Sequence, residues 1–403
     1  MTDKWKMCII ANNDYHSSVL NHYDIEGIIM QETIFGKTEQ TVNRLRSLYK
    51  RYGYKKYKMS RFETYDFYLE NRDFLQSEHV ITFTDLRGRL MALKPDVTLS
   101  IVKNAAGEKS ELQKYFYHEN VFRMMEGTHE FREILQVGLE YIGRIDLYAV
   151  CEVLTLARKS LEEIGEPYLL EISHMGLVSE VLKEAGLQEW AQRQALKLIG
   201  QKNVHELRKL CCTVGLSEDA CALLEQLASL YGPFTEVFPK VKALAEHCAK
   251  PALEELEAVY RVLRESGQAE GINLDFSITN DMRYYNGIIF QGYVQGIPKS
   301  VLSGGRYDGL LHKFSGNKQS GAIGFAVYAD QLEAYASSGK QYDADVVLRY
   351  DAEAPVSGVL QTVQQLTAQG LTVRAQSGDG QEILAGQTLY YTRNGLERGG
   401  ADD

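Results

Sequence analysis

Three polar residues between positions 132 and 140 have the spacing needed to share one face of a β-strand. Arg132, Gln136 and Glu140 are four residues apart, and alternate residues of a strand point to the same side of a sheet. A guanidinium, an amide and a carboxylate on one face can hold a polar ligand with opposite charges at its two ends. The same pattern is typical of a solvated sheet face, so the spacing alone leaves both interpretations open.

A second candidate group is the segment 93–98, with the sequence LKPDVT. Pro95 favours the first turn of a helix, and we predict a helix from Pro95 through Lys103. Asp96 then lies where the helix dipole favours a negative charge. Asp96 and Thr98 could receive the ammonium group of a ligand, or they could cap the helix.

A third candidate group consists of two aromatic segments, 283–287 (RYYNG) and 303–309 (SGGRYDG). Paired tyrosines in strands usually serve packing. The glycine pair before Arg306 permits a close backbone approach, either by a neighbouring strand or by a ligand. Each group is weak evidence for a site by itself, and their order along one chain makes them informative together.

The elements that must position these residues are mainly strands. Residues 114–123 and 132–143, separated by the polar loop 126–130, are predicted to form a long antiparallel hairpin. Helices are predicted at 33–51 and 147–164. Further strands are predicted at 54–62, 79–85, 90–93, 168–172, 272–278, 284–293, 299–303 and 322–328, with a turn at 85–88. Consecutive strands with helices grouped elsewhere favour the α+β class.

The composition and hydrophobic periodicity of the sequence change at two places, which predicts three regions. Leucine and alanine at helical spacing between 176 and 267 predict an all-helical insertion, with breaks at glycines and at Pro251. The core is therefore assigned to residues 1–175 and 268–335. Residues 342–403 are predicted to form a short α/β remnant, with a strand at 346–348, a helix at 359–369, a strand at 371–374 and a frayed tail from Glu397.

Composition excludes several classes of protein. The chain has 403 residues and a net charge of -10, and the acidic balance disfavours nucleic acid as a main partner because phosphate contacts need a basic face. Its six cysteines show no C-x-x-C pair or metal-ligand spacing, which is typical of reduced thiols. No apolar run reaches the ~18 residues of a membrane helix. We expect a cytoplasmic protein with no membrane partner, metal or cofactor.

Taken together, the three groups resemble the histidyl-tRNA synthetase family over about residues 15–335. Residues 303–310 (SGGRYDGL) are similar to the family's second histidine-specific signature, and 284–286 (YYN) to the core of the first. Residues 122–140 resemble class II motif 2, and 93–98 resemble the family's L-R-P-E-x-T segment. The resemblance implies a class II synthetase fold, with an antiparallel sheet flanked by helices.

The resemblance also implies that the histidine pocket is retained. Carried over position by position, Asp96, Thr98 and Gln136 would face the α-amino group of histidine. Glu140 and Tyr285 would face its imidazole. The remaining residues that the resemblance assigns to this pocket are Tyr284, Arg306 and Tyr307.

The nucleotide half, by contrast, departs from the family pattern. Arg123 is the clearest survivor among the arginines that serve ATP in the family. The departures are Asn280 and Gln331 for two arginines, Glu130 for a motif 2 loop arginine, Tyr328 for the motif 3 glycine, Ile134 for the adenine-stacking aromatic residue and Ser60 for the motif 1 proline. Adenylyl transfer depends on positive charge around the polyphosphate, and one stabilising group can be worth ~3 kcal/mol. We therefore do not expect the chain to activate histidine.

A histidine pocket without activation chemistry resembles the regulatory subunits of ATP phosphoribosyltransferase. That resemblance implies a short catalytic subunit as partner, L-histidine as feedback effector and a homodimer within a hetero-oligomer. It leaves open whether histidine binds the inherited pocket or a subunit interface. Two alternatives remain: a divergent histidyl-tRNA synthetase or other class II amino-acid adenylating enzyme, and an interaction protein with a vestigial pocket.

Overall fold

The structure, a computed structural model, describes residues 37–72, 75, 80–105, 112–124, 130–279, 284–316, 319–336, 343–378 and 383–398. The chain divides into two compact units, one spanning 38–338 and one formed by residues 1–37 and 339–403, of which Lys37, 343–378 and 383–398 are described. Each unit is described by itself. In these described residues, every helix is too short or too polar to cross a membrane.

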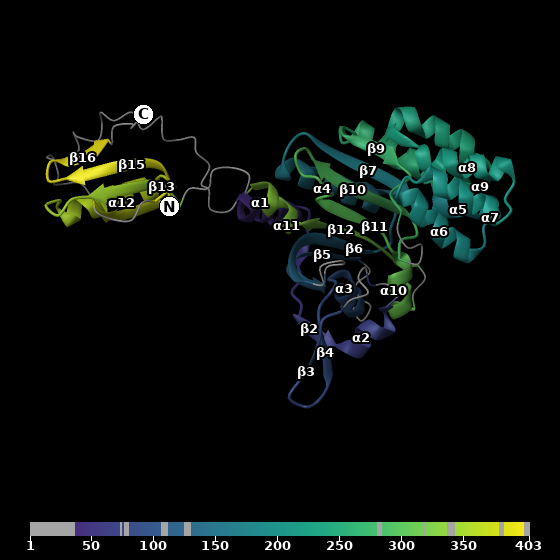
Figure 1. Cartoon of the computed structure of the whole chain (residues 1–403), viewed down its shortest axis with the longest axis horizontal. Helices are drawn as coiled ribbons and strands as arrows, with labels where there is room; N and C mark the ends of the chain where they lie inside the picture. The colour runs from purple at the N-terminus through teal and green to yellow at the C-terminus, as the bar shows by residue number, and fades with distance from the viewer. Residues whose placement is uncertain are drawn as a thin grey trace, which may run out of the picture. The chain divides into compact units, whose positions relative to one another are not determined.

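A nine-stranded sheet forms the centre of the larger unit (Figure 1). Its strand order is β1 (Lys55–Lys56), β5 (Leu112–Met124), β6 (Phe131–Gly143), β12 (Gly321–Tyr328), β11 (Leu302–Arg306), β10 (Ile288–Val294), β7 (Tyr168–His174), β9 (Ile272–Asp275) and β8 (Tyr231–Pro233). Neighbours from β5 to β7 are antiparallel, whereas β1–β5 and β7–β9 are parallel. The predicted α+β class with a mainly antiparallel sheet is confirmed.

The β5–β6 hairpin is the longest strand pair and carries the first candidate group. Tyr117 pairs with Gly138 and Arg123 pairs with Arg132, so the two strands stay in register over their whole length. The hairpin predicted from the alternating sequence is confirmed. Its tip, residues 125–129, lies outside the described residues.

Helix α4 (Leu147–Ile164) covers one face of the sheet (Figure 1). The Asp146 carboxylate caps it by accepting a hydrogen bond from the Ala149 amide at 3.0 Å, and the predicted bounds 147–164 are confirmed. A Cβ placed on Gly292 would lie 2.6 Å from Leu161 of α4. The neighbouring residues on β10, which alternate with Gly292, therefore point to the opposite face.

The other helices of the core are α1 (Lys37–Arg51), α2 (Tyr65–Glu70), α3 (Thr98–Ala105), α10 (Asp308–Ser315) and α11 (Ala329–Ala336). Tyr49 of α1 packs its ring edge-on against Phe325 of β12 at 5.9 Å and hydrogen-bonds to Ser160 of α4 at 2.9 Å. This contact fixes α1 against the sheet and α4.

The insertion is mostly helical but not entirely so. It contains α5 (Met175–Glu184), α6 (Glu189–Gly200), α7 (Val204–Thr213), α8 (Glu218–Ser229) and α9 (Phe234–Glu265). Strand β8 joins the main sheet through β9, so the expectation of an all-helical segment is wrong. The expected break at Pro251 is confirmed, because α9 consists of two helical segments that meet at a kink at Ala249, whose φ of -124° and ψ of 31° are not helical. The boundaries at 176 and 267 stay a prediction.

Several predicted elements differ near the candidate residues. The expected strand 54–62 is reduced to β1, and a small sheet follows with the order β2 (Phe62–Thr64), β4 (Leu90–Leu93) and β3 (Thr82–Thr84). Helix α3 begins at Thr98 and not at Pro95, because the Asp96 carboxylate accepts the Leu99 amide at 2.8 Å and thereby starts the helix there. Tyr284 and Tyr285 precede β10 and do not belong to a strand.

The smaller unit has its own sheet and core. Its strand order is β14 (Val373–Ser377), β13 (Ala344–Tyr350), β15 (Ala385–Thr392) and β16 (Gly395–Arg398), with helix α12 (Val356–Ala368). The core consists of Val346, Leu348, Val359, Leu366 and Leu389. The C-terminal tail was expected to fray from Glu397 onward. This starting point is wrong, because Glu397 pairs with Tyr390 in the sheet.

Candidate functional site

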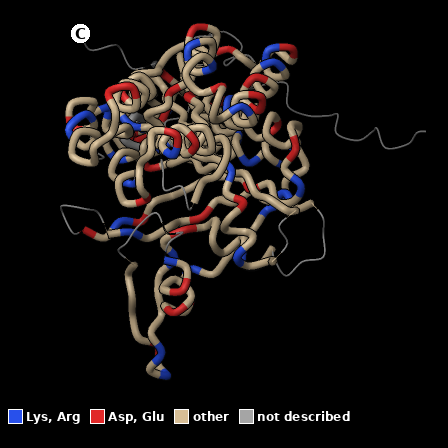
Figure 2. Tube along the Cα trace, turned by 90° about the vertical axis from the view of Figure 1, so that its right-hand side faces the viewer, with Lys and Arg blue, Asp and Glu red and all other residues tan. Residues whose placement is uncertain are grey.

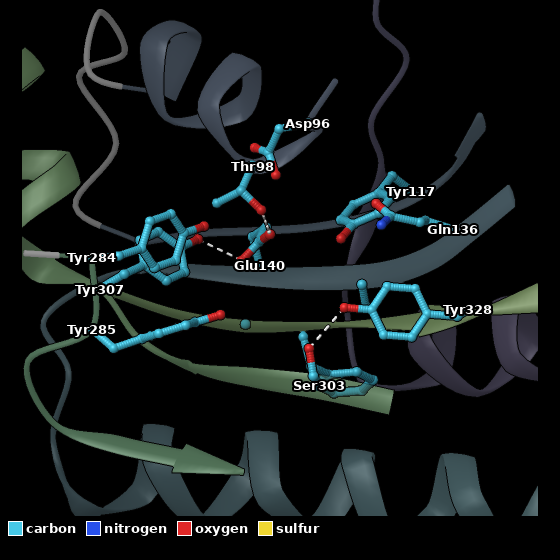
Figure 3. Close-up of a pocket in the computed structure, with 13 residues that line it drawn as sticks. Asp96, Thr98, Tyr117, Gln136, Glu140, Tyr284, Tyr285, Ser303, Tyr307 and Tyr328 are labelled. Carbon is cyan, nitrogen blue, oxygen red and sulfur yellow. Dashed lines mark hydrogen bonds between the residues drawn. The ribbon is translucent and has the colours of Figure 1, made fainter. Parts of the chain in front are cut away.

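A cavity lies on the face of the sheet opposite α4, over β5, β6, β11 and β12 (Figure 3). Glu140 and Thr98 lie at its centre, with three tyrosines at one end and Gln136, Tyr117 and Tyr328 at the other. Its volume is about 20 Å³, which is room for about one water molecule, so a larger ligand requires its walls to move apart. The lining residues are Asp96, Thr98, Tyr117, Gln136, Glu140, Tyr284, Tyr285, Ser303, Tyr307, Gly324, Phe325, Ala326 and Tyr328.

The Glu140 carboxyl group is the centre of the cavity's polar contacts. It accepts a hydrogen bond from the Thr98 hydroxyl at 2.7 Å on Oε1 and one from the Tyr307 hydroxyl on Oε2. Burial raises the pKa of Glu140 to about 8, and these two hydrogen bonds lower it. A Cβ on Gly324 would lie 1.8 Å from Oε2 of Glu140, so this strand position must be glycine for the carboxyl to fit.

Asp96 caps a helix and also lines the cavity. One of its oxygens accepts a hydrogen bond from the Leu99 amide at the start of α3. It is 6% exposed, and burial raises the pKa of its carboxyl group, while the Leu99 amide and Arg123 lower it. Two buried carboxyl groups, Asp96 and Glu140, therefore face the same small space.

Tyrosine hydroxyls supply most of the remaining wall. Burial raises the pKa of Tyr117, Tyr284, Tyr285 and Tyr307 well above the ordinary value, so these hydroxyls stay neutral. The rings of Tyr284 and Tyr285 meet edge to face at 4.5 Å. A Cβ on Gly305 would lie 2.8 Å from the Tyr285 ring. A Cβ on Gly304 would lie 2.3 Å from the Gly324 carbonyl oxygen of β12, so the close approach predicted for the glycine pair is made by the neighbouring strand at Gly304 and by the Tyr285 ring at Gly305.

The other end of the cavity is closed by Tyr328. Its hydroxyl hydrogen-bonds to the Ser303 hydroxyl at 2.8 Å, and Gln136 lies beside it (Figure 3). Tyr328 occupies the position where the resemblance placed a glycine. A large side chain therefore fills space that a glycine would leave open.

The described lining includes acids, an amide and hydroxyls but neither lysine nor arginine. Such a wall accepts hydrogen bonds from N–H groups and favours a positive charge. Within the described residues, no group of three or more His, Cys, Asp or Glu side chains could hold a metal ion. The chemistry of the cavity suits a small ligand that carries ammonium or ring N–H groups.

The structure brings together seven of the eight residues assigned to the histidine pocket, namely Asp96, Thr98, Gln136, Glu140, Tyr284, Tyr285 and Tyr307. The placement of Arg306 in this cavity is wrong. Its Nε donates to Oδ2 of Asp308 at 2.8 Å, and its Nη1 lies 3.6 Å from Oε1 of Glu255. Alternation along β11 explains this, because Ser303 faces the cavity and Arg306, three residues on, faces away.

Two arginines of the hairpin also lie outside the lining. Arg132 is exposed, 4.0 Å from Glu130, so the three-residue face contributes only Gln136 and Glu140. Arg123 donates from Nε to the Pro95 carbonyl at 3.0 Å, and its Nη2 is buried with no hydrogen-bond partner among the residues that the structure describes. Asn280 lies outside the described residues.

Tyr117, Ser303 and Tyr328 were not among the residues predicted to line the site. Tyr117 pairs with Gly138, between Gln136 and Glu140 on the same face, so the hairpin register would have identified it. Ser303 pairs with Ala326, which also lines the cavity. The alternation of β11 and β12 contains this signal, but the register between distant strands does not follow from either strand alone.

Comparison with known proteins identifies the family. The family model described as Histidyl-tRNA synthetase matches residues 31–332. An ATP phosphoribosyltransferase regulatory subunit from Clostridium kluyveri is 31% identical over 332 residues, which span 79% of this chain and 83% of the relative. The chain belongs to the histidyl-tRNA synthetase-like family of ATP phosphoribosyltransferase regulatory subunits.

Solved structures agree with this family at the level of the fold. A Bacillus halodurans structure described as an ATP phosphoribosyltransferase regulatory subunit/histidyl-tRNA synthetase is 24% identical with a TM-score of 0.72, covering 88% of this chain and 94% of that chain. A chain of the ATP phosphoribosyl transferase (HisG:HisZ) complex from Thermotoga maritima is 20% identical with a TM-score of 0.57, covering 72% of this chain and 96% of that one.

Proposed function

We propose that this chain binds a short ATP phosphoribosyltransferase catalytic subunit, binds L-histidine in the Glu140 cavity and catalyses no reaction of its own. Its role in histidine biosynthesis is that of a regulatory subunit. One observation carries the finer proposal: the cavity keeps the acids and tyrosines that suit histidine, while its described lining contains no cation for a polyphosphate.

Histidine carries the two groups that this lining is built to accept. Its ammonium group can bind Asp96 and the Gln136 amide oxygen, which lie in the wall of the cavity. Its imidazole N–H can donate to Glu140 when the carboxyl is ionised. For the α-carboxylate we propose Arg123, whose charge acts on Asp96 of the cavity wall and whose buried Nη2 has no hydrogen-bond partner among the described residues.

Two features argue against adenylate formation. Gln331 stands where the family has a motif 3 arginine, and its amide hydrogen-bonds to the neighbouring Asp330 carboxylate at 3.0 Å. Tyr328 narrows the nucleotide side of the cavity. A neutral amide beside a carboxylate cannot stabilise the charge that develops on a polyphosphate.

The partner is proposed from the family's role and from the Thermotoga maritima HisG:HisZ complex, which pairs two kinds of subunit. Histidine can regulate such an assembly only if it binds the active and inhibited states unequally. The narrow cavity offers a physical basis for this, because a state with separated walls admits histidine more easily. We also propose a homodimer within the hetero-oligomer, as the class II resemblance implies.

The second candidate, an amino-acid adenylating enzyme, is favoured by one feature. The free Nη2 of Arg123 could bind a phosphate as well as a carboxylate. Histidine-dependent exchange of pyrophosphate into ATP separates the two candidates. The proposal expects no exchange above a sample without protein, and robust exchange would establish the enzyme.

Calorimetry with L-histidine tests the site. Glu140→Gln keeps the shape of the side chain but cannot ionise when histidine binds, and we expect at least a tenfold loss of affinity, which corresponds to about 1.4 kcal/mol. The matched control is Glu171→Gln, because Glu171 carries a buried carboxyl group on the same face of the sheet but outside this cavity. This variant should change the affinity for histidine less than twofold. Loss of binding in the control alone would place histidine elsewhere.

A further inference from the structure

A second, larger cavity lies on the same face of the sheet, beside the first. Gln291 of β10 lines it, and Gln291 is the register partner of Ser303, which lines the first cavity. Its volume is about 660 Å³, within the range of roughly 300–1,000 Å³ found for small-molecule pockets. Its lining residues come largely from β7, β9 and β10 and from the end of α6, elements that Figure 1 labels.

Two buried carboxyl groups line this second cavity, and they differ in how many hydrogen-bond donors the protein gives them. Asp275 is satisfied, because it accepts the Ser277 amide at 2.8 Å and the Lys202 ammonium at 3.0 Å. Glu171 is 6% exposed, and in the described part of the chain its hydrogen-bond donor is the Tyr231 hydroxyl. A carboxylate can accept about four hydrogen bonds, so Glu171 keeps most of its acceptor capacity for a ligand.

The backbone of Lys202 adopts an unfavourable left-handed conformation. Its φ of 52° is positive, which among the described residues is shared only with glycines. Helices α5, α7 and α9 end with Gly186, Gly215 and Gly267 at positive φ, whereas α6 ends with a lysine. This left-handed conformation is unfavourable for a residue that has a Cβ atom. Strain of this kind concentrates at functional sites.

The side chain of Lys202 shows what this strained position provides. Its ammonium binds Asp275 and lies 4.6 Å from the centre of the Tyr231 ring. Lys202 thus pairs directly with Asp275 and contacts one aromatic wall, while its charge also lowers the pKa of Glu171 without forming an ion pair with that carboxyl group. On the other side, the Tyr293 hydroxyl donates to the Gln291 amide oxygen at 2.7 Å and is thereby oriented.

We propose that the second cavity binds a small organic cation with planar N–H donors, such as an amidinium, guanidinium or imidazolium group, through the Glu171 carboxylate. Tyr231 and Tyr293 provide aromatic surfaces for a flat ligand, and cations are attracted to such faces. With Glu171 ionised, two carboxylates and one lysine give the lining a net charge of -1, which a monocation neutralises. This proposal does not depend on the proposed function.

Binding of a cation should be linked to the protonation of Glu171. Burial, with the nearby Asp275, raises the pKa of Glu171 to about 7. A cation favours the ionised form, so affinity should rise from pH 6 to pH 8, and binding at pH 6 should release a proton. The other titratable groups around this carboxyl are Asp275 from β9, Lys202 after α6, Tyr231 from β8 and Tyr293 from β10.

The test uses benzamidine, a flat amidinium, and benzamide, which has the same shape without the charge. Calorimetry on the full chain at pH 8 should detect benzamidine binding, with benzamide at least tenfold weaker. Glu171→Gln should weaken benzamidine at least tenfold and abolish the dependence on pH. Glu140→Gln, the matched change in the first cavity, should alter it less than twofold.

Three results would overturn the proposal: no benzamidine binding, equal affinity for benzamide, or loss of binding in Glu140→Gln while Glu171→Gln binds normally. Circular dichroism checks that each variant folds. If Glu171→Gln does not fold, Tyr293→Ala tests the same wall, and unchanged benzamidine affinity in that variant would equally contradict the site.

Discussion

Glu140 is buried, hydrogen-bonded to two hydroxyls and close to a second carboxyl group, and this environment makes stability depend on pH. Its pKa is about 8 in the folded chain and 4.5 in the absence of these surroundings. Between these values the folded state holds a proton that the unfolded state has released, so stability is lost as pH rises.

Glu140→Gln removes this dependence because an amide does not titrate. We expect the stability of the variant relative to the native chain to increase from pH 5 to pH 8, by on the order of 2 kcal/mol. Urea unfolding at several pH values measures this. Glu171 contributes a slope of the same sign in both proteins, so the difference between them isolates Glu140. Parallel pH profiles would show that Glu140 is ionised in the folded chain.

At the scale of single residues, the sequence predicted which residues line the site better than it predicted which residues they contact. Glu140 and Thr98 were placed by motifs that lie 42 positions apart, and their hydrogen bond confirms that they meet. Tyr328 was read only as a departure from a glycine. That its hydroxyl reaches Ser303 depends on the register of β11 against β12, and pairing between distant strands is not encoded locally.

At the scale of elements, Arg306 links strand β11 to the helical insertion. The family resemblance had placed this residue in the histidine pocket. Arg306 lies between Asp308 of α10 and Glu255 of α9. Glu255 also accepts from His174, which caps α5 at the Leu177 amide. These charges tie the end of β11 to two helices of the insertion.

Arg306→Ala should therefore destabilise the fold and leave the ligand site intact. Removing one partner from a part-buried ion network leaves the others uncompensated, and a loss of about 1–3 kcal/mol in the free energy of unfolding is expected. Histidine affinity of the folded variant should change less than twofold by calorimetry. Tyr307→Phe, which removes the hydroxyl that reaches Glu140, is the comparison expected to weaken histidine. An Arg306→Ala variant of normal stability that fails to bind histidine would restore this arginine to the pocket.

Elements with strong local signals were predicted well. Helix α4 has a capping aspartate, a helical apolar face and a terminal glycine, and its bounds were correct. Strand β15 (Ala385–Thr392) was missed because its burial comes from pairing with β13 and β16 and not from a strong apolar alternation. The break predicted from Pro251 lies at Ala249, because a proline lacks the amide hydrogen of a helical hydrogen bond and its ring clashes with the preceding turn.

For the whole molecule, the division into two units separates the ligand site from the C-terminal sheet. All described residues that line the Glu140 cavity belong to the larger unit. Both signs of charge are interspersed along the tube in Figure 2, as expected for a surface without one dominant charge.

A chain ending at residue 338 should therefore keep the histidine site. We expect its affinity for L-histidine, measured by calorimetry, to lie within twofold of that of the full chain. The unfolding profile of the truncated chain at matched pH provides the control for its integrity. Loss of histidine binding in a truncated chain that unfolds cooperatively would show that residues 339–403 contribute to the site.

The central claim is that this chain makes a catalytic partner both active and sensitive to histidine. The most direct measurement is the rate of phosphoribosyl transfer by the short catalytic subunit, alone, with the native chain and with Glu140→Gln. We predict a higher rate with either chain, and inhibition by histidine with the native chain that is at least tenfold weaker with Glu140→Gln. An unchanged rate with no complex formed would contradict the regulatory role, and equal inhibition with both chains would contradict the Glu140 cavity as the histidine site.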